Sequence, residues 1–158
     1  MEMINKLTFR LFDPVKAGEE WAVSDNYPYK VVGISIDGRE LLDIIREIEY
    51  PYLKEEDSLI LDGDYGHLPP DRLYEDLREA AQPGTYYYKR GAELFCCGSC
   101  GEPGCWSVTC KVREECGVVL WYGFRHNHRD WDYNLTFRFE KSAYEKAMRI
   151  LQHMAMNN

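Results

Sequence analysis

Alternation of apolar and polar residues marks several stretches of the chain as half-buried strands. It is clearest at residues 7–11, where Leu7, Phe9 and Leu11 alternate with polar side chains. Side chains of a strand point to its two faces in turn, so this period of two predicts strands with one face in a core. The same period continues at residues 32–36, 106–112, 118–124 and 135–139.

A period of three to four residues predicts the first helix directly after the second strand. Asp37 is suited to be its N-cap, with Glu40 three residues later completing a capping box. The apolar positions 41, 44, 45 and 48 fall on one face, and Pro51 is predicted to end the helix. Residues 51–71 are rich in Gly, Asp and Pro, and they are predicted to form a less regular loop.

Two further helices follow from the same kind of pattern. Residues 72–81 carry apolar positions at helical spacing and are followed by Pro83 and Gly84. Near the end of the chain, Ser142 and Glu145 have the spacing of a capping box before a last apolar stripe. Strands that follow one another, with helices between, predict an α+β fold: a mostly antiparallel sheet of about five or six strands with two or three packed helices. The 158 residues fit a single domain, 1–158.

Charge and composition limit the classes of partner and the compartment. The formal net charge is −8, which opposes generic binding to nucleic acid or to an anionic membrane. The start of the chain lacks a basic segment followed by an apolar run, and no apolar run approaches the ~18 residues of a membrane helix. The expected location is therefore the cytoplasm, where cysteines are thiols or metal ligands rather than disulfides.

The strongest chemical signal is a cluster of cysteines between residues 96 and 105. Cys97 and Cys100 are separated by two residues, and Cys105 follows a glycine-containing turn, a spacing that suits one zinc ion. A structural zinc needs a fourth ligand, which His128 or Cys96 could supply. The favoured interpretation needs no cofactor: reduced thiols packed at a corner between strands, with one structural zinc and a redox pair as the alternatives. A redox pair is the weaker alternative, because a strand rather than a helix is predicted to follow.

Cys110 extends the series to the spacing of a retroviral zinc knuckle, C-x2-C-x4-C-x4-C. However, Cys110 is in phase with the apolar face of the predicted strand at 106–112, about 16 Å along the chain from Cys105. Residues 84–130 also hold six basic residues against five acidic ones, too even a balance for phosphate binding. Cys110 is therefore predicted to be a core residue.

A second polar cluster occupies residues 125–133. If the segment is extended, His126, His128, Asp130 and Asp132 share one side and could form a metal or acid–base site. The favoured interpretation is simpler: a polar loop anchored by its aromatic residues, Trp131 and Tyr133.

Three segments together resemble a family of small uncharacterised bacterial proteins. They are residues 32–42, the Cys-Gly-Glu-Pro-Gly-Cys-Trp turn at 100–106, and the His-Arg-Asp-Trp segment at 128–131. Members of that family place a Cys-Gly-x-x-Gly-Cys-Trp turn before a strand and a His-Arg-x-Trp segment after the next one. The resemblance implies one domain from about residue 30 to the last helix, and it implies no reaction because the family has no established activity.

Two classes of function follow from these observations. Residues 36–82 hold 14 acidic residues against 5 basic ones, which favours a non-enzymatic binding protein with a basic protein partner, for example an immunity or inhibitor protein. The alternative is a metal- or thiol-dependent enzyme that uses Cys97, Cys100 and Cys105 together with His126 or His128. The alternative requires a histidine within about 5 Å of a thiol, inside a concave pocket.

Overall fold

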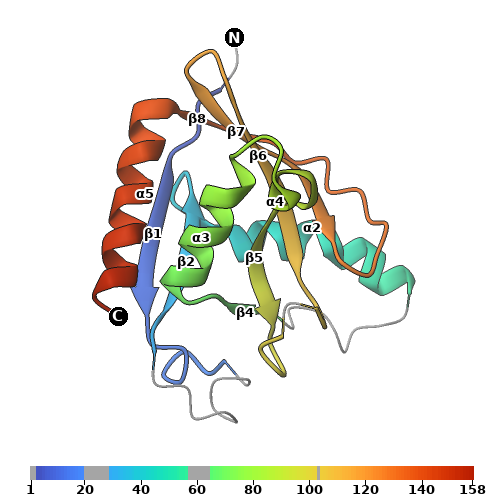
Figure 1. The fold of residues 1–158 in the computed structure, drawn as a ribbon. Coiled ribbons are helices and arrows are strands. Elements are labelled where there is room, and N and C mark those ends of the chain that lie inside the picture. Colours follow the sequence, from blue (N-terminus) through green and yellow to red (C-terminus); the bar gives the residue numbers. More distant parts are fainter. Residues whose placement is uncertain (1–2, 20–28, 57–64, 103) are drawn as a thin grey trace.

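Two antiparallel sheets form the framework of the protein, shown in Figure 1 by a computed structural model that describes residues 3–19, 29–56, 65–102 and 104–158. The smaller sheet has three strands in the order β1-β2-β3. The larger has five in the order β4-β5-β6-β7-β8. Their bounds are β1 Leu7–Phe12, β2 Val31–Ile36, β3 Arg39–Glu40, β4 Tyr65–His67, β5 Ala92–Cys97, β6 Val108–Glu115, β7 Val118–His126 and β8 Phe137–Glu140.

Helices cover both sides of this framework. In Figure 1, α3 lies in front of the strands, α5 runs beside β1, and α2 passes behind. The helices of the described residues are α2 Leu41–Glu55, α3 Pro70–Ala80, α4 Tyr86–Arg90 and α5 Lys141–Met156. Within the same residues, none has both the length and the apolar character of a membrane span. The predicted α+β class is confirmed, although the strands form two sheets rather than one.

Many of the core residues are apolar positions that the sequence periodicity selects. Ile34 and Ile36 of β2 are buried, as are Leu41 and Ile45 of α2. In the larger sheet Cys110 is fully buried between Val108 and Val112, which confirms it as a core residue. The largest side chains that are almost completely buried are Trp121, Phe95, Phe139, Ile34, Leu41, Ile45, Leu53, Leu68, Leu73, Leu77, Leu94 and Leu151.

The predicted helix cap at Asp37 is wrong, because this position is the turn of a hairpin. Asp37 and Gly38 both have positive φ angles, 54° and 81°, and they connect the paired residues Ile36 and Arg39. Such a two-residue turn matches the twist of antiparallel strands. The Asp37 carboxylate accepts hydrogen bonds from Asn5 and from the backbone of Lys6 instead of capping a helix. Helix α2 begins only at Leu41.

The predicted end of the helix at Pro51 is also wrong. Helix α2 continues through Pro51 to Glu55, although proline cannot donate the backbone hydrogen bond. Leu53 beyond it is fully buried, and Tyr52 stacks on Trp131 with ring centroids 5.7 Å apart. The packing of Leu53 and Tyr52 outweighs the free-energy cost of a proline inside the helix. The predicted loop at 51–71 therefore includes the end of α2, all of β4 and the start of α3, while residues 57–64 lie outside the described residues.

The helix cap predicted at Ser142 is wrong, because Ser142 is already the second residue of helix α5. Helix α5 starts at Lys141, directly after β8, and Glu140 is the residue at its N-cap. The Ser142 hydroxyl hydrogen-bonds the carboxylate of Glu140. Strands β4 and β5 and helix α4 were not predicted, because β4 and α4 are short and β5 is buried on both faces and shows no alternation.

Candidate metal centre

The cysteine cluster lies at the end of β5, in the loop that leads to β6. Cys97 is the last residue of β5. The backbone N–H of Gly101 donates to the carbonyl of Cys97 at 2.8 Å, which closes a turn that carries Cys100. Gly101 has a φ of 77°, a conformation that suits glycine. A second turn, from Cys105 N–H to the Glu102 carbonyl at 3.1 Å, brings Cys105 back toward the same strand end.

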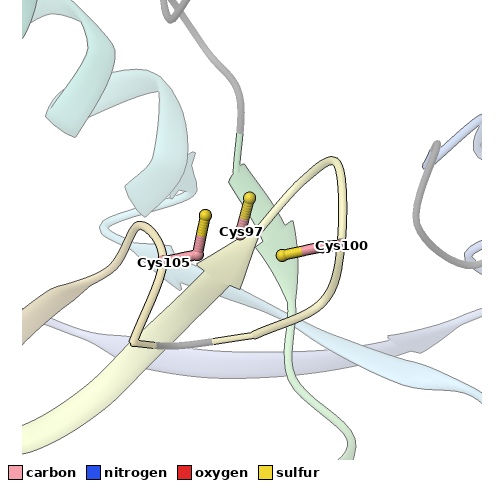
Figure 2. A group of neighbouring side chains, drawn as sticks. All are labelled: Cys97, Cys100 and Cys105. Atoms are coloured by element: carbon pink, nitrogen blue, oxygen red, sulfur yellow. The ribbon is translucent and has the colours of Figure 1, made fainter.

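These two turns bring three sulfur atoms together. The Sγ atoms of Cys97, Cys100 and Cys105 all lie within 4.8 Å of one another. Figure 2 shows the three side chains pointing toward a common space. Thiolates at ~2.3 Å from one zinc ion are about 4 Å apart, so the loop needs at most a small contraction to hold a metal. Cys97 is buried and the other two are exposed, so the group opens to solvent on one side.

Hydrogen bonds to its neighbours hold the proton on the Cys105 thiol when no metal is bound. Contacts with the thiols of Cys97 and Cys100, and then burial, raise the pKa of Cys105 to about 12. A metal ion that binds Cys105 would displace this proton, because the thiolate is the ligand. The group could therefore hold a metal ion, as the sequence predicted for these three residues.

The remaining cysteines lie elsewhere in the structure. The thiol of Cys96 hydrogen-bonds the carbonyl of His67 at 3.6 Å, and burial raises its pKa to about 12. Burial likewise raises the pKa of Cys110. Cys116 is exposed in the turn between β6 and β7. Among the described residues the sulfur group thus consists of Cys97, Cys100 and Cys105, and Cys96 is outside it.

His128 lies beside the loop, and its ring contacts the backbone rather than the sulfur group. Its Nε2 is 2.8 Å from the carbonyl oxygen of Gly104, the residue before Cys105. A carbonyl only accepts, so Nε2 carries a proton and donates. Asn127 donates to the same carbonyl from its amide at 3.0 Å, and it accepts from the backbone N–H of Ser107. Residues 127 and 128 therefore brace the cysteine loop from outside, a role of Asn127 that the sequence did not indicate.

The other polar residues of this segment do not form a metal group within the described part of the chain. His126 ends β7 and is buried, with its ring centroid 3.9 Å from that of Trp106. Trp131 and Tyr133 are buried, which confirms that aromatic residues anchor this segment.

Comparisons with protein-family models, with curated proteins and with solved structures found no match for this chain. The resemblance to a family of small bacterial proteins therefore stays a prediction. The geometry of the described residues carries the functional argument.

Proposed function

We propose that this protein binds one zinc ion through Cys97, Cys100 and Cys105. The observation that carries the proposal is the approach of three sulfur atoms to within 4.8 Å of one another. Thiolates are soft ligands, and zinc is the common metal of such cysteine-rich turns. The three ligands come from the strand end and from both turns of the loop, so one ion would hold the whole loop at 98–105 against β5.

The fourth ligand decides whether the ion is structural or open to a substrate. Two of the three cysteines are exposed, which leaves a position that solvent can reach. His128 stays a prediction for this position; to reach the ion it would use Nδ1, or it would give up its bond to Gly104. Four protein ligands are typical of a structural zinc, and three with water are typical of a catalytic one.

For the whole molecule we propose a zinc-stabilised binding protein of the cytoplasm rather than an enzyme. In the described residues neither histidine of the 125–133 segment belongs to the sulfur group, so nothing supports a thiol paired with a histidine base. The acidic stretch at 36–82 favours a basic protein partner, as in an immunity or inhibitor protein. A reducing compartment would keep the thiols available for zinc.

The test is elemental analysis of protein purified without chelator, compared with Cys100→Ser and with Cys116→Ser. Cys116 is the matched control, because it is exposed like Cys100 and lies outside the sulfur group. We expect about one zinc per chain in the wild type and in Cys116→Ser, and a large loss together with a lower melting temperature in Cys100→Ser.

His128→Ala then assigns the fourth position. Loss of zinc in this variant would make His128 a ligand, and full retention would leave water or an external group there. A wild type without metal, with all cysteines titrating as thiols or with a disulfide within the group, would overturn the zinc proposal.

A further inference from the structure

A cleft of about 470 Å³ lies between the two sheets and the start of α2. Its walls come from segments far apart in the sequence: β1, residues 17–19, α2 and β4. More than half of the lining side chains are polar or charged, so a polar ligand would find hydrogen-bonding groups on several walls. The lining includes Arg10, Phe12, Glu19, Glu40, Arg46 and His67.

A histidine held by a carboxylate forms one wall of the cleft. Nδ1 of His67 makes a short contact with the carboxylate of Glu19, and the backbone N–H of His67 donates to the same carboxylate at 3.2 Å. The side chains are only 11% and 10% exposed. The ring also packs edge-on against Phe12 and Phe95, with centroids 4.9 and 5.6 Å away. Its position is therefore fixed by contacts on several sides.

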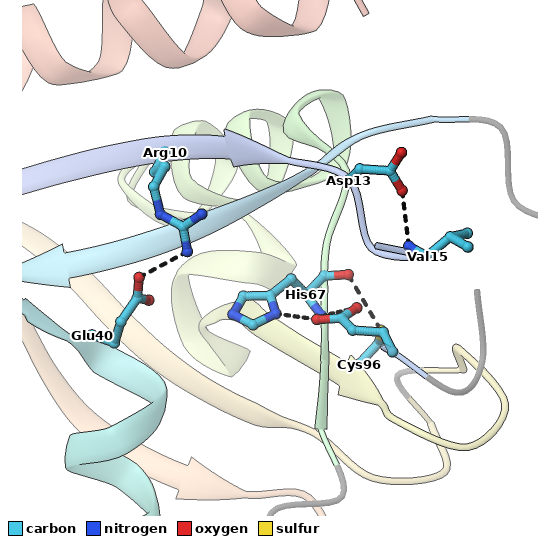
Figure 3. A network of polar contacts seen from close by, with 7 residues as sticks. Arg10, Asp13, Val15, Glu40, His67 and Cys96 are labelled. Atoms are coloured by element: carbon cyan, nitrogen blue, oxygen red, sulfur yellow. Dashed lines mark hydrogen bonds and ion pairs between the residues drawn. The ribbon is translucent and has the colours of Figure 1, made fainter. Parts of the chain in front are cut away.

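This arrangement decides which ring nitrogen is available. A carboxylate accepts hydrogen bonds, so Nδ1 of the neutral ring carries the proton and Nε2 has a lone pair. No described residue hydrogen-bonds Nε2. Figure 3 shows this nitrogen on the side of the ring that faces Arg10 and Glu40, whereas Nδ1 takes part in the dashed contact. The cleft thus contains an oriented hydrogen-bond acceptor (Figure 3).

Arg10 supplies a positive charge on the opposite wall. Its Nη2 is 3.1 Å from the Glu40 carboxylate, and the guanidinium lies 4.7 Å from the ring of Phe12. Gly33 belongs to β2, the strand between those that carry Arg10 and Glu40. A Cβ there would be 3.3 Å from both charged groups, so its absence gives the pair room on the sheet. The side chain of Arg10 is 59% exposed, and no described residue accepts a hydrogen bond from its other N–H groups. Arg46 adds a second guanidinium to the lining.

We propose that this cleft binds a small phosphate-like oxyanion that carries its own hydroxyl. The remaining guanidinium donors of Arg10 would contact the negative oxygens, and Nε2 of His67 would accept the hydrogen bond of the hydroxyl. Glu19 is a positioning residue, because it acts through His67 rather than on the ligand. The inference does not depend on zinc binding, since no cysteine takes part.

The experiment is a titration of ¹⁵N-labelled protein with inorganic phosphate at constant ionic strength, followed by the ring nitrogens of His67 and by Nε of Arg10. We expect Nδ1–H and an unprotonated Nε2 in the free protein, and saturable shifts at both residues with phosphate. Acetate has no hydroxyl and should bind more weakly. Methyl phosphate, whose dianion has no hydroxyl either, should also bind more weakly than inorganic phosphate in a parallel titration; equally tight binding would overturn the role given to Nε2 of His67.

Matched variants separate the site from general charge effects. Arg10→Gln should weaken phosphate binding at least about tenfold, because a charged hydrogen-bond donor is lost. Arg39→Gln is the control: Arg39 is comparably exposed, pairs with Glu47 and does not line the cleft. Glu19→Gln removes the carboxylate that fixes the tautomer of His67. The ¹⁵N spectra of the ring should then show that Nδ1–H is no longer the preferred form. If Arg10→Gln does not fold, the wild-type titration decides alone. A proton on Nε2 in the free protein, shifts that do not saturate, or equal weakening by Arg39→Gln would overturn the proposal.

Discussion

At the scale of single residues, His126 shows how burial sets the charge of a side chain. It is 1% exposed, between the rings of Trp106 and Trp131. Its Nδ1 accepts the backbone N–H of His128 at 3.0 Å, so Nε2 carries the proton of the neutral ring. No described residue accepts a hydrogen bond from Nε2. Burial, and then the charge of Arg129, lower the pKa of His126 to about 3, and the ring is therefore neutral at physiological pH.

This lowered pKa predicts a loss of stability in acid. The unfolded chain protonates this histidine near its ordinary pKa of ~6.5, whereas the folded protein resists protonation down to about 3. Stability is therefore fully present above pH 6.5 and is lost progressively between these two values. Urea denaturation of zinc-free protein from pH 7 to pH 4 should show the loss, and His126→Phe should lose less stability over the same range.

His153→Gln is the control for this prediction, because His153 is exposed on α5. It should follow the wild-type curve. A His126→Phe curve that falls as steeply as that of the wild type would show that other groups cause the acid sensitivity.

At the scale of elements, a buried carboxylate ties α2 to two other parts of the structure. Glu49 is fully buried in the middle of the helix. Its Oε2 accepts the hydroxyl of Tyr65 from β4 at 2.6 Å and that of Tyr133 from the 127–136 segment at 2.5 Å. Burial raises the pKa of both tyrosines, and the charge of Glu49 raises it further, so both hydroxyls remain donors. The helix position thus depends on contacts across 16 and 84 residues of sequence.

We expect Glu49→Leu to destabilise the protein by about 2–5 kcal/mol, because two buried hydroxyls lose their acceptor. Urea denaturation at neutral pH measures the change. The informative control is the triple variant Glu49→Leu, Tyr65→Phe, Tyr133→Phe. Replacing the acceptor and both hydroxyl donors by apolar groups of similar shape is nearly neutral, so this variant should recover much of the loss. A triple variant less stable than Glu49→Leu would contradict the assignment.

At the scale of the whole molecule, hydrogen bonds between single residues join the two sheets. The N–H of Asn5, just before β1, donates to the carbonyl of Arg138 in β8 at 2.6 Å. The N–H of Arg138 donates back to the side chain of Asn5 at 2.9 Å. On the other side, Val32 of β2 donates to the carbonyl of Leu68, just after β4, at 2.9 Å. The Asn5 side chain also donates to Asp37 of the β2–β3 turn, so it links the start of β1 to β8 and to this turn.

Asn5→Ala should therefore loosen the junction of the two sheets. We expect a loss of about 1–2 kcal/mol and faster amide hydrogen exchange at Arg138, because its N–H loses its acceptor. Gln152→Ala, at an exposed position of α5, is the control and should leave this exchange unchanged. Unchanged protection of Arg138 in Asn5→Ala would show that the junction does not depend on this side chain.

The elements that the sequence alone determines are those with a repeated pattern. Strands β1, β2, β6, β7 and β8 show alternation, and the helices α2, α3 and α5 show apolar stripes. The sequence-based predictions fail where a local signal competes with contacts that form only in the folded protein. The dipeptide Asp37-Gly38 is compatible with a helix cap and with a hairpin turn. It forms the hairpin turn because β3 pairs with β2. Pro51 favours a helix end, but burial of Leu53 extends the helix.

The three cysteines could be predicted as a group because they lie within nine residues of chain, where two turns suffice to bring them together. The sequence could not assign a fourth ligand, because the position of His128 depends on how the 127–136 segment packs on the loop. The pair of Glu19 and His67 had no sequence signal at all, since 48 residues separate them. Local patterns follow from the geometry of the chain itself. The cleft exists only because two sheets and a helix pack together, and that packing depends on contacts between distant residues.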